Sequence, residues 1–129
     1  MSNSYQYSFE KLEVWRKSKE FVLFIYKVLE SFPNEEKFNL VSQLKRASTS
    51  IVSNIAEGTS RSSLRDQMRF IEIAYGSSIE VYCQLILSHD LGFLSQSDLD
   101  QGKFYLKEIT SMLSALKKSQ AQRLSTPKL

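Results

Sequence analysis

Residues 43–58, QLKRASTSIVSNIAEG, constrain the fold more than any other stretch of the chain. Five of them recur at helical spacing and form a narrow seam: Leu44, Ala47, Ser48, Ile51 and Ile55. Because the seam includes the small residues Ala47 and Ser48, a neighbouring helix can come close. Gly58 follows at the position where a helix C-cap takes a left-handed backbone. The stretch therefore predicts the second half of a long helix that ends at this glycine and packs against a close neighbour.

Helical periodicity extends over most of the remaining chain. The expected helices span about Phe9–Ser31, Asn34–Glu57, Ser63–Ser88 and Gln96–Ser119. Pro33 ends the first helix, because a proline pushes the residue before it out of helical geometry. Asn34 is expected to cap the second helix. Ser63 and Ser95 each have an aspartate three residues later, at the spacing of a capping box, so both are expected to begin a helix.

Four helices joined by short connections predict an all-α fold, an antiparallel up-down-up-down four-helix bundle. The bundle is expected at residues 9–119, with a flexible N-terminal tail at 1–8 and a frayed C-terminal tail at 120–129. A chain of 129 residues is long enough for one core. Four glycines and two prolines are too few for a loop-rich or all-β fold.

Two runs, 21–26 (FVLFIY) and 79–87 (IEVYCQLIL), are apolar around most of the helix. A helix in a four-helix bundle normally leaves one face in water, so these runs imply a second buried surface. Another subunit is the natural source of that surface. The residues expected at the subunit interface are Phe21, Phe24, Tyr26, Val81 and Tyr82.

A polar stripe follows the seam at steps of four, four and three residues: Arg46, Ser50, Asn54 and Glu57. One interpretation is a contact with a ligand or a nucleic acid. The other, which we favour, is a structural network in which Arg46 pairs with Glu57 or Glu80. Buried polar groups must satisfy one another, and such networks are suited to fixing helix register and assembly state.

The formal charge of +3 and a pI of about 9.0 are compatible with nucleic-acid binding without being diagnostic of it. The candidate contacts are Arg61, Arg65 and Arg69, spaced four residues apart and expected on one helix face, together with Lys45, Lys103 and Lys107. In a monomer these residues would form an ordinary solvated surface. In a symmetric oligomer they would repeat as a charged ring able to contact phosphates.

The reactive groups that an enzyme brings together are not recognisable in the sequence. His89 is the one histidine, so the Glu-x-x-His pattern of di-iron bundles is missing. The segment IAEGTSR lacks the spacing and the lysine of a phosphate-binding loop. We expect no enzymatic activity, no metal and no cofactor, and a hydrolase or metal enzyme is the least favoured alternative.

The single cysteine, Cys83, lies in an apolar helical run and is expected to be a small core residue in a reducing compartment. Met1–Ser8 is polar and lacks the apolar core of a signal peptide. No apolar run is long enough to indicate a membrane span. The chain is therefore expected to be cytoplasmic, with no membrane partner.

Several segments, in order along the chain, match one known family. They are Leu12–Trp15 (LEVW), Phe32-Pro33, Gln43–Gly58, Phe70–Ser78 (FIEIAYGSS) with Glu80, and Leu91–Leu94 (LGFL). In these segments the chain resembles the four helix bundle protein family, also called the 23S ribosomal RNA intervening-sequence protein family. The resemblance implies a homopentamer of antiparallel bundles, some of them encoded within intervening sequences of ribosomal RNA genes. It also implies nucleic-acid association, since a related accessory factor of diversity-generating retroelements binds nucleic acid and a reverse transcriptase.

Two functions are consistent with these features. The first is a non-enzymatic homo-oligomer that binds RNA or DNA through its repeated basic residues. The second is a protein-interaction scaffold without a nucleic-acid role, in which the same arginines contact acidic partners. Charge reversal at Arg65 and Arg69 separates them, because only the first function predicts a loss of RNA binding.

Overall fold

The computed structural model of the chain describes residues 5–126. Over this range it contains no strand and four α-helices: α1 (Glu13–Leu29), α2 (Leu40–Thr59), α3 (Leu64–Asp90) and α4 (Gln96–Ser125). Two 3-10 helices, Ser8–Lys11 and Asn34–Glu36, precede α1 and α2. The predicted all-α class with four helices is confirmed.

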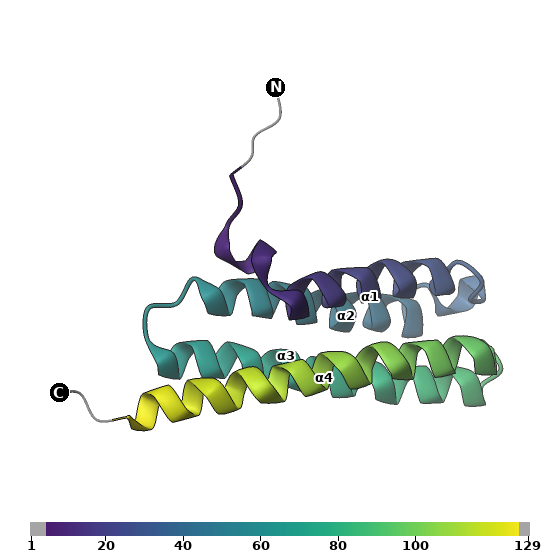
Figure 1. The fold of residues 1–129 in the computed structure, drawn as a ribbon. Coiled ribbons are helices and arrows are strands. Elements are labelled where there is room, and N and C mark those ends of the chain that lie inside the picture. The colour runs from purple at the N-terminus through teal and green to yellow at the C-terminus, as the bar shows by residue number, and fades with distance from the viewer. Residues whose placement is uncertain (1–4, 127–129) are drawn as a thin grey trace.

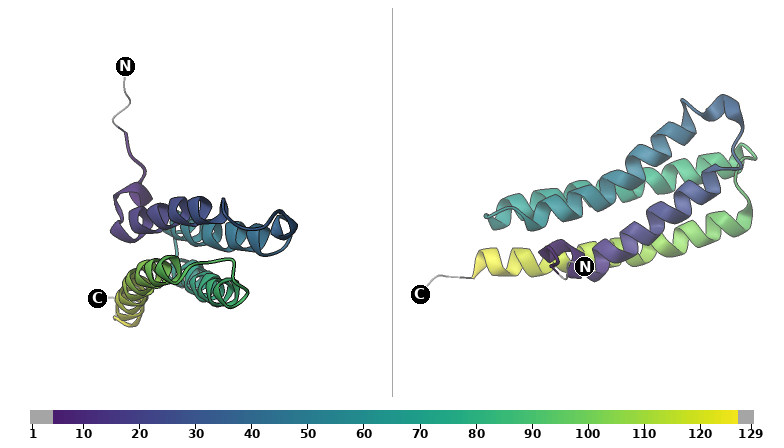
Figure 2. Two further views of the ribbon diagram at one scale, coloured as in Figure 1. Left: turned by 90° about the vertical axis from the view of Figure 1, so that its right-hand side faces the viewer. Right: turned by 90° about the horizontal axis from the view of Figure 1, so that it is seen from above.

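The helices form two layers, with α1 beside α2 in one layer and α3 beside α4 in the other (Figures 1 and 2). The connections between consecutive helices alternate between the two ends of the molecule (Figure 1). Across the layers, α2 packs on α3 and α1 packs on α4, whereas no Cα atom of α1 lies within 8 Å of one of α3 in the described part of the chain. Helices α1 and α3 are therefore diagonal neighbours.

The predicted seam of α2 is fully buried at each of its five positions: Leu44, Ala47, Ser48, Ile51 and Ile55. Gly58, however, does not end the helix, which continues to Thr59, and its backbone is not left-handed. A Cβ atom at this position would lie 3.1 Å from Cβ of Phe70 on α3. The C-cap prediction was wrong, because the glycine is needed for the close approach of α2 to α3.

The helix boundaries differ from the prediction at two places. Helix α2 begins at Leu40, because Asn34 begins a 3-10 turn instead of capping the helix. Helix α4 continues to Ser125 and buries Gln120, so it extends beyond the predicted end at Ser119 into the residues expected as a tail. The two predicted caps at Ser63 and Ser95 are confirmed, since each serine Oγ accepts a hydrogen bond of 3.1 Å from the backbone N–H three residues later.

The described part of the predicted N-terminal tail, residues 5–8, is exposed, and a 3-10 helix begins at its last residue. Residues 1–4 and 127–129 of the two predicted tails lie outside the described residues.

The expected interface residues have different surroundings. Phe21 and Val81 are fully buried within the single chain, so this part of the prediction was wrong. Phe24 and Tyr82 are half-buried and pack against the core, whereas Tyr26 is 41% exposed. The reason is that the core takes only some residues of each apolar run, those that recur at helical spacing, and leaves the others outside. Cys83, expected in the core, is among the exposed residues.

Helix α3 is more apolar than we expected. Among the described helices it alone is long and apolar enough to cross a bilayer by length and composition, with a mean hydropathy of 1.2 over its best window. The expectation that no run reaches this length is therefore corrected. Within the bundle, 39% of that window is buried. Much of the apolar surface of α3 is thus not covered by its own chain.

The close approach at Gly58 predicts a strong size dependence. Gly58→Leu should destabilise the protein by about 1–3 kcal/mol, because the added side chain would force α2 and α3 apart. The measurement is the free energy of unfolding from urea titration, with Ser53→Leu on the exposed side of the same helix as a control. Equal stability of both variants and the unmodified protein would contradict the close packing.

Candidate nucleic-acid interface

The polar stripe on α2 faces α3, and its N-terminal member, Arg46, belongs to a chain of side-chain contacts. Arg46 Nη2 pairs with the carboxylate of Glu80. Gln84 Nε2 donates to Oε2 of the same Glu80 at 3.3 Å and to Gln43 Oε1 at 3.1 Å. Of the two partners predicted for Arg46, the structure therefore places Glu80 beside it.

The lower half of the stripe joins the same two helices through hydroxyl groups. Ser50 Oγ and Ser77 Oγ share a hydrogen bond of 2.9 Å across the helix boundary. Asn54 Nδ2 donates to the carbonyl oxygen and to Oγ of Ser50 at 2.8 and 3.0 Å. Glu57 lies outside this network, because its carboxylate is 3.6 Å from Nη2 of Arg61.

The three arginines do not share one helix face. Arg61 lies in the turn before α3 begins at Leu64, so it is out of register with the other two. Its guanidinium carbon is 4.6 Å from the ring centre of Phe70 and its carboxylate partner is Glu57. The expectation of a common face was therefore wrong for Arg61.

Arg65 and Arg69 line a hollow at the end of the bundle together with Glu72 and Leu124. The continuation of α4 brings a further arginine, Arg123, to this end, where it lines a second hollow beside Gly58 and Gln67. Within residues 5–126, none of Arg65, Arg69 and Arg123 forms an ion pair with a carboxylate.

Arg123 was missed in the sequence because residues 120–129 were expected to fray. The signal that was available is the helical spacing of Leu113, Leu116 and Gln120, which continues the buried face of α4. A glutamine in place of an apolar residue obscured that continuation.

The lysine candidates lie in two other places. Lys103 and Lys107 line a hollow of about 190 Å³ between α3 and α4, beside Ile79 and Tyr82. Lys45 lies on the other side of the bundle, with Nζ 5.0 Å from the ring centre of Tyr26. The six predicted basic residues thus do not form one compact patch, and Lys45 and Arg61 lie apart from the hollows that contain the other four.

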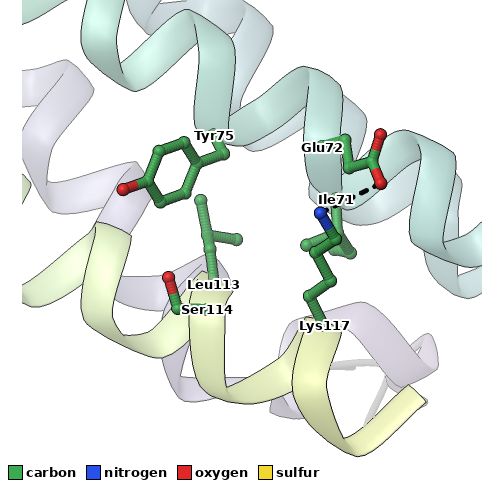
Figure 3. A pocket seen from close by; sticks show the side chains of 6 residues that line it. All are labelled: Ile71, Glu72, Tyr75, Leu113, Ser114 and Lys117. Carbon is green, nitrogen blue, oxygen red and sulfur yellow. Dashed lines mark ion pairs between the residues drawn. The ribbon is translucent and has the colours of Figure 1, made fainter. Parts of the chain in front are cut away.

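A further hollow, of about 270 Å³, lies along α3 and α4 between the hollow of Arg65 and Arg69 and the hollow of Lys103 and Lys107 (Figure 3). Ile71 and Leu113 form its apolar part. Tyr75 lies on one side, and an ion pair between Lys117 Nζ and Glu72 Oε1, 3.0 Å long, lies on the other (Figure 3).

Residues able to bind a metal are not gathered anywhere in the described range: no three His, Cys, Asp or Glu side chains are placed to hold one ion. His89 Nδ1 is 3.5 Å from Oδ1 of its neighbour Asp90.

The pair between Arg46 and Glu80 predicts a small energetic coupling. Their side chains are 61% and 38% exposed, and exposed ion pairs contribute at most about 1 kcal/mol. A double-mutant cycle of Arg46→Ala and Glu80→Ala, followed by urea unfolding, should give a coupling energy below that value. A coupling of several kcal/mol would mean that the pair is desolvated in the native assembly.

Comparisons with known proteins cover nearly all of this arrangement. The family model described as 23S rRNA-intervening sequence protein matches residues 10–115. A crystal structure of a protein with unknown function from the S23 ribosomal protein family of Bacteroides thetaiotaomicron VPI-5482 has 27% sequence identity to this chain and a TM-score of 0.76. That similarity covers 81% of this chain and 98% of the other. No protein of curated function matches. The chain thus belongs to the 23S rRNA-intervening sequence protein family.

Proposed function

We propose that this protein is a non-enzymatic, cytoplasmic bundle of the antiparallel up-down-up-down type that assembles as a homopentamer and binds RNA or DNA through repeated basic residues. The observation that carries the proposal is the set of arginines at one end of the molecule. Arg65 and Arg69 from α3 and Arg123 from α4 have no carboxylate partner within the described residues.

Guanidinium groups that form no ion pair with a carboxylate are free to neutralise phosphates. Arginine suits this role because its planar donors match the geometry of a phosphate group and it stays charged at all physiological pH values. Contacts of this kind give salt-dependent and weakly sequence-selective binding. The name of the family refers to ribosomal RNA, which makes a structured RNA the first ligand to test.

Oligomerisation is supported by two apolar surfaces on opposite corners of the bundle. The first, which we name the α1 patch, consists of Leu23, 66% exposed, and Tyr26. The second, the α3 outer face, consists of exposed residues at helical spacing: Ile73, Gly76, Cys83 and Leu87. A Cβ atom at Gly76 would meet nothing within 4 Å, so this face has room for a neighbour.

The position of the two surfaces favours a ring over a two-fold dimer. A ring joins two different surfaces of each subunit, whereas a two-fold dimer joins one surface to itself. The α1 patch and the α3 outer face belong to the diagonal helices α1 and α3. The α1 patch can therefore contact one neighbouring subunit while the α3 outer face contacts another.

Assembly would also strengthen the electrostatics. One chain has a formal charge of only +3, which is modest for a nucleic-acid binder. Five copies around one axis multiply that charge and place the arginine ends in a repeated array, so that one RNA molecule can contact several subunits.

RNA binding is the first prediction of this proposal. The purified protein should bind a labelled structured RNA saturably, with affinity that falls steeply as salt rises, because phosphate contacts release counterions. Arg65→Glu with Arg69→Glu should lower the affinity about tenfold or more and reduce the salt slope by about two. Fluorescence anisotropy at several salt concentrations measures both quantities.

The matched control reverses two lysines at the opposite end of the bundle, Lys27→Glu with Lys37→Glu, which changes the net charge equally. This variant should retain most of the affinity. Equal losses in both variants would indicate an effect of net charge alone. Unchanged binding in the arginine variant would favour the scaffold function, in which the arginines contact acidic proteins.

Assembly is the second prediction. Light scattering should give a mass of about five times the 14.9 kDa of one chain. Leu23→Glu and Ile73→Glu should each abolish the ring, because each disrupts one of its two joined surfaces. Mixed together, the two variants should form a heterodimer, since each retains the surface that the other has lost. An intact oligomer in either variant, or no heterodimer on mixing, would contradict the ring.

A further inference from the structure

The hollows between α3 and α4 follow one another along a single groove, which we name the α3–α4 groove. Its α3 side consists of residues at steps of three and four: Arg65, Met68, Glu72, Tyr75, Ile79 and Tyr82. Its α4 side runs antiparallel from Lys103 to Leu124. From Arg65 to Tyr82 the helical rise corresponds to about 26 Å. The groove is therefore an extended channel on the surface of one chain.

The residues that line the α3–α4 groove have a higher formal positive charge than the chain as a whole. The residues lining its three hollows include five cations, Arg65, Arg69, Lys103, Lys107 and Lys117, and one carboxylate, Glu72. The lining thus has a formal charge of +4, while the entire chain has +3. The rest of the molecule is slightly acidic. An anionic ligand is consequently attracted to this groove in preference to the remaining surface.

Aromatic and apolar side chains lie between these cations. Tyr75 is 39% exposed and Ile79 is 51% exposed, and Tyr82 is half-buried at the edge of the hollow that contains Lys103 and Lys107. Tyr75 stands at the side of the middle hollow, above the apolar floor of Leu113 (Figure 3). The two tyrosines are about 10 Å apart along the helix. A cationic channel with aromatic rings along it is the arrangement by which proteins bind unpaired strands.

The dimensions of the groove select a single strand over a duplex. Neighbouring packed helices have axes about 8–10 Å apart, so the depression between them accommodates one backbone. In a duplex the bases are stacked on one another and their faces are not available to tyrosine rings. In a single strand the bases can turn outwards and stack on aromatic side chains while the phosphates meet the lysines.

We propose that the α3–α4 groove binds single-stranded nucleic acid, with bases stacked on Tyr75 and Tyr82 and phosphates neutralised by Lys103, Lys107 and the arginines at the end of the bundle. The proposal rests on the nucleic-acid binding proposed above and specifies its ligand. It also gives one role to Arg65, Arg69, Lys103 and Lys107, which lie in separate hollows of the same channel.

The test uses the full-length protein with an unstructured labelled oligouridine, a single-stranded DNA oligonucleotide of matching length and a blunt RNA duplex, at low salt. Both single strands should bind at least tenfold more tightly than the duplex. Tyr75→Leu, which retains apolar volume and removes the ring, should weaken single-strand binding roughly 5- to 100-fold. It should leave duplex binding unchanged, and Tyr75→Phe should restore the single-strand affinity.

Phe38→Leu provides the control, since Phe38 is an 84% exposed aromatic residue in the connection between α1 and α2, outside the α3–α4 groove and the two assembly surfaces. This variant should bind the single strands normally. Tyr82→Leu should weaken them as Tyr75→Leu does, and Lys103→Gln with Lys107→Gln should reduce the salt slope for the single strand by about two. Preference for RNA over DNA would locate a contact to the 2′-hydroxyl within the same groove.

Three results would overturn the groove proposal. Equal binding of single strands and duplex, with no effect of the tyrosine variants, would contradict it and leave the basic end as the nucleic-acid site. A change of oligomer mass in Tyr75→Leu would assign the groove to a contact between copies of the chain. Absence of binding to any of the three ligands at low salt would overturn the general nucleic-acid proposal as well.

Discussion

The rest of the structure depends on the close packing of α2 against α3. The seam on α2 is fully buried, and Gly58 has no side chain. The backbone of α2 can therefore come within van der Waals distance of Cβ of Phe70 on α3. Because interiors are close-packed, such a contact fixes both the separation and the rotation of the two helices. The contacts of Arg46 with Glu80 and of Ser50 with Ser77 then follow at the same boundary.

The fixed rotation of α3 determines what each of its other faces contacts. One side of the helix packs into the core, one forms the groove with α4, and one faces outwards with Ile73 and Leu87. This division explains why a helix of a small bundle is long and apolar enough to cross a bilayer by length and composition. A helix with a single buried face would need far fewer apolar residues.

The sequence was sufficient for the features that depend on local spacing. Helical periodicity predicted the seam, and the two serine–aspartate pairs predicted the starts of α3 and α4. The sequence was insufficient where two different structural requirements can be met by the same residue type. A glycine near a helix end fits a left-handed cap as well as a close helix contact, and Gly58 proved to be the second. The apolar run of α1 likewise did not reveal that Phe21 faces the core and Leu23 faces outwards.

The candidate site was predicted only in its parts. Arg65, Arg69, Lys103 and Lys107 were identifiable as basic residues, but their common groove arises from the antiparallel register of α3 and α4. That register is a property of the packed helices and of no single segment. Arg123 was hidden for a related reason, because Gln120 is buried through its contacts in the fold although its side chain is polar.

The unequal lengths of the helices have a consequence for the basic end. Helix α4 has 30 residues and α1 has 17, and the last turns of α4, with Arg123, project past the start of α1 (Figure 1). Residues 121–126 are all exposed, whereas the middle of the helix has a buried face. The last turns therefore open at a lower free-energy cost than the rest of α4. An anion bound by Arg123 would stabilise the ordered end of this helix by mass action. Ligand occupancy and local order at this end of the bundle are thereby thermodynamically linked.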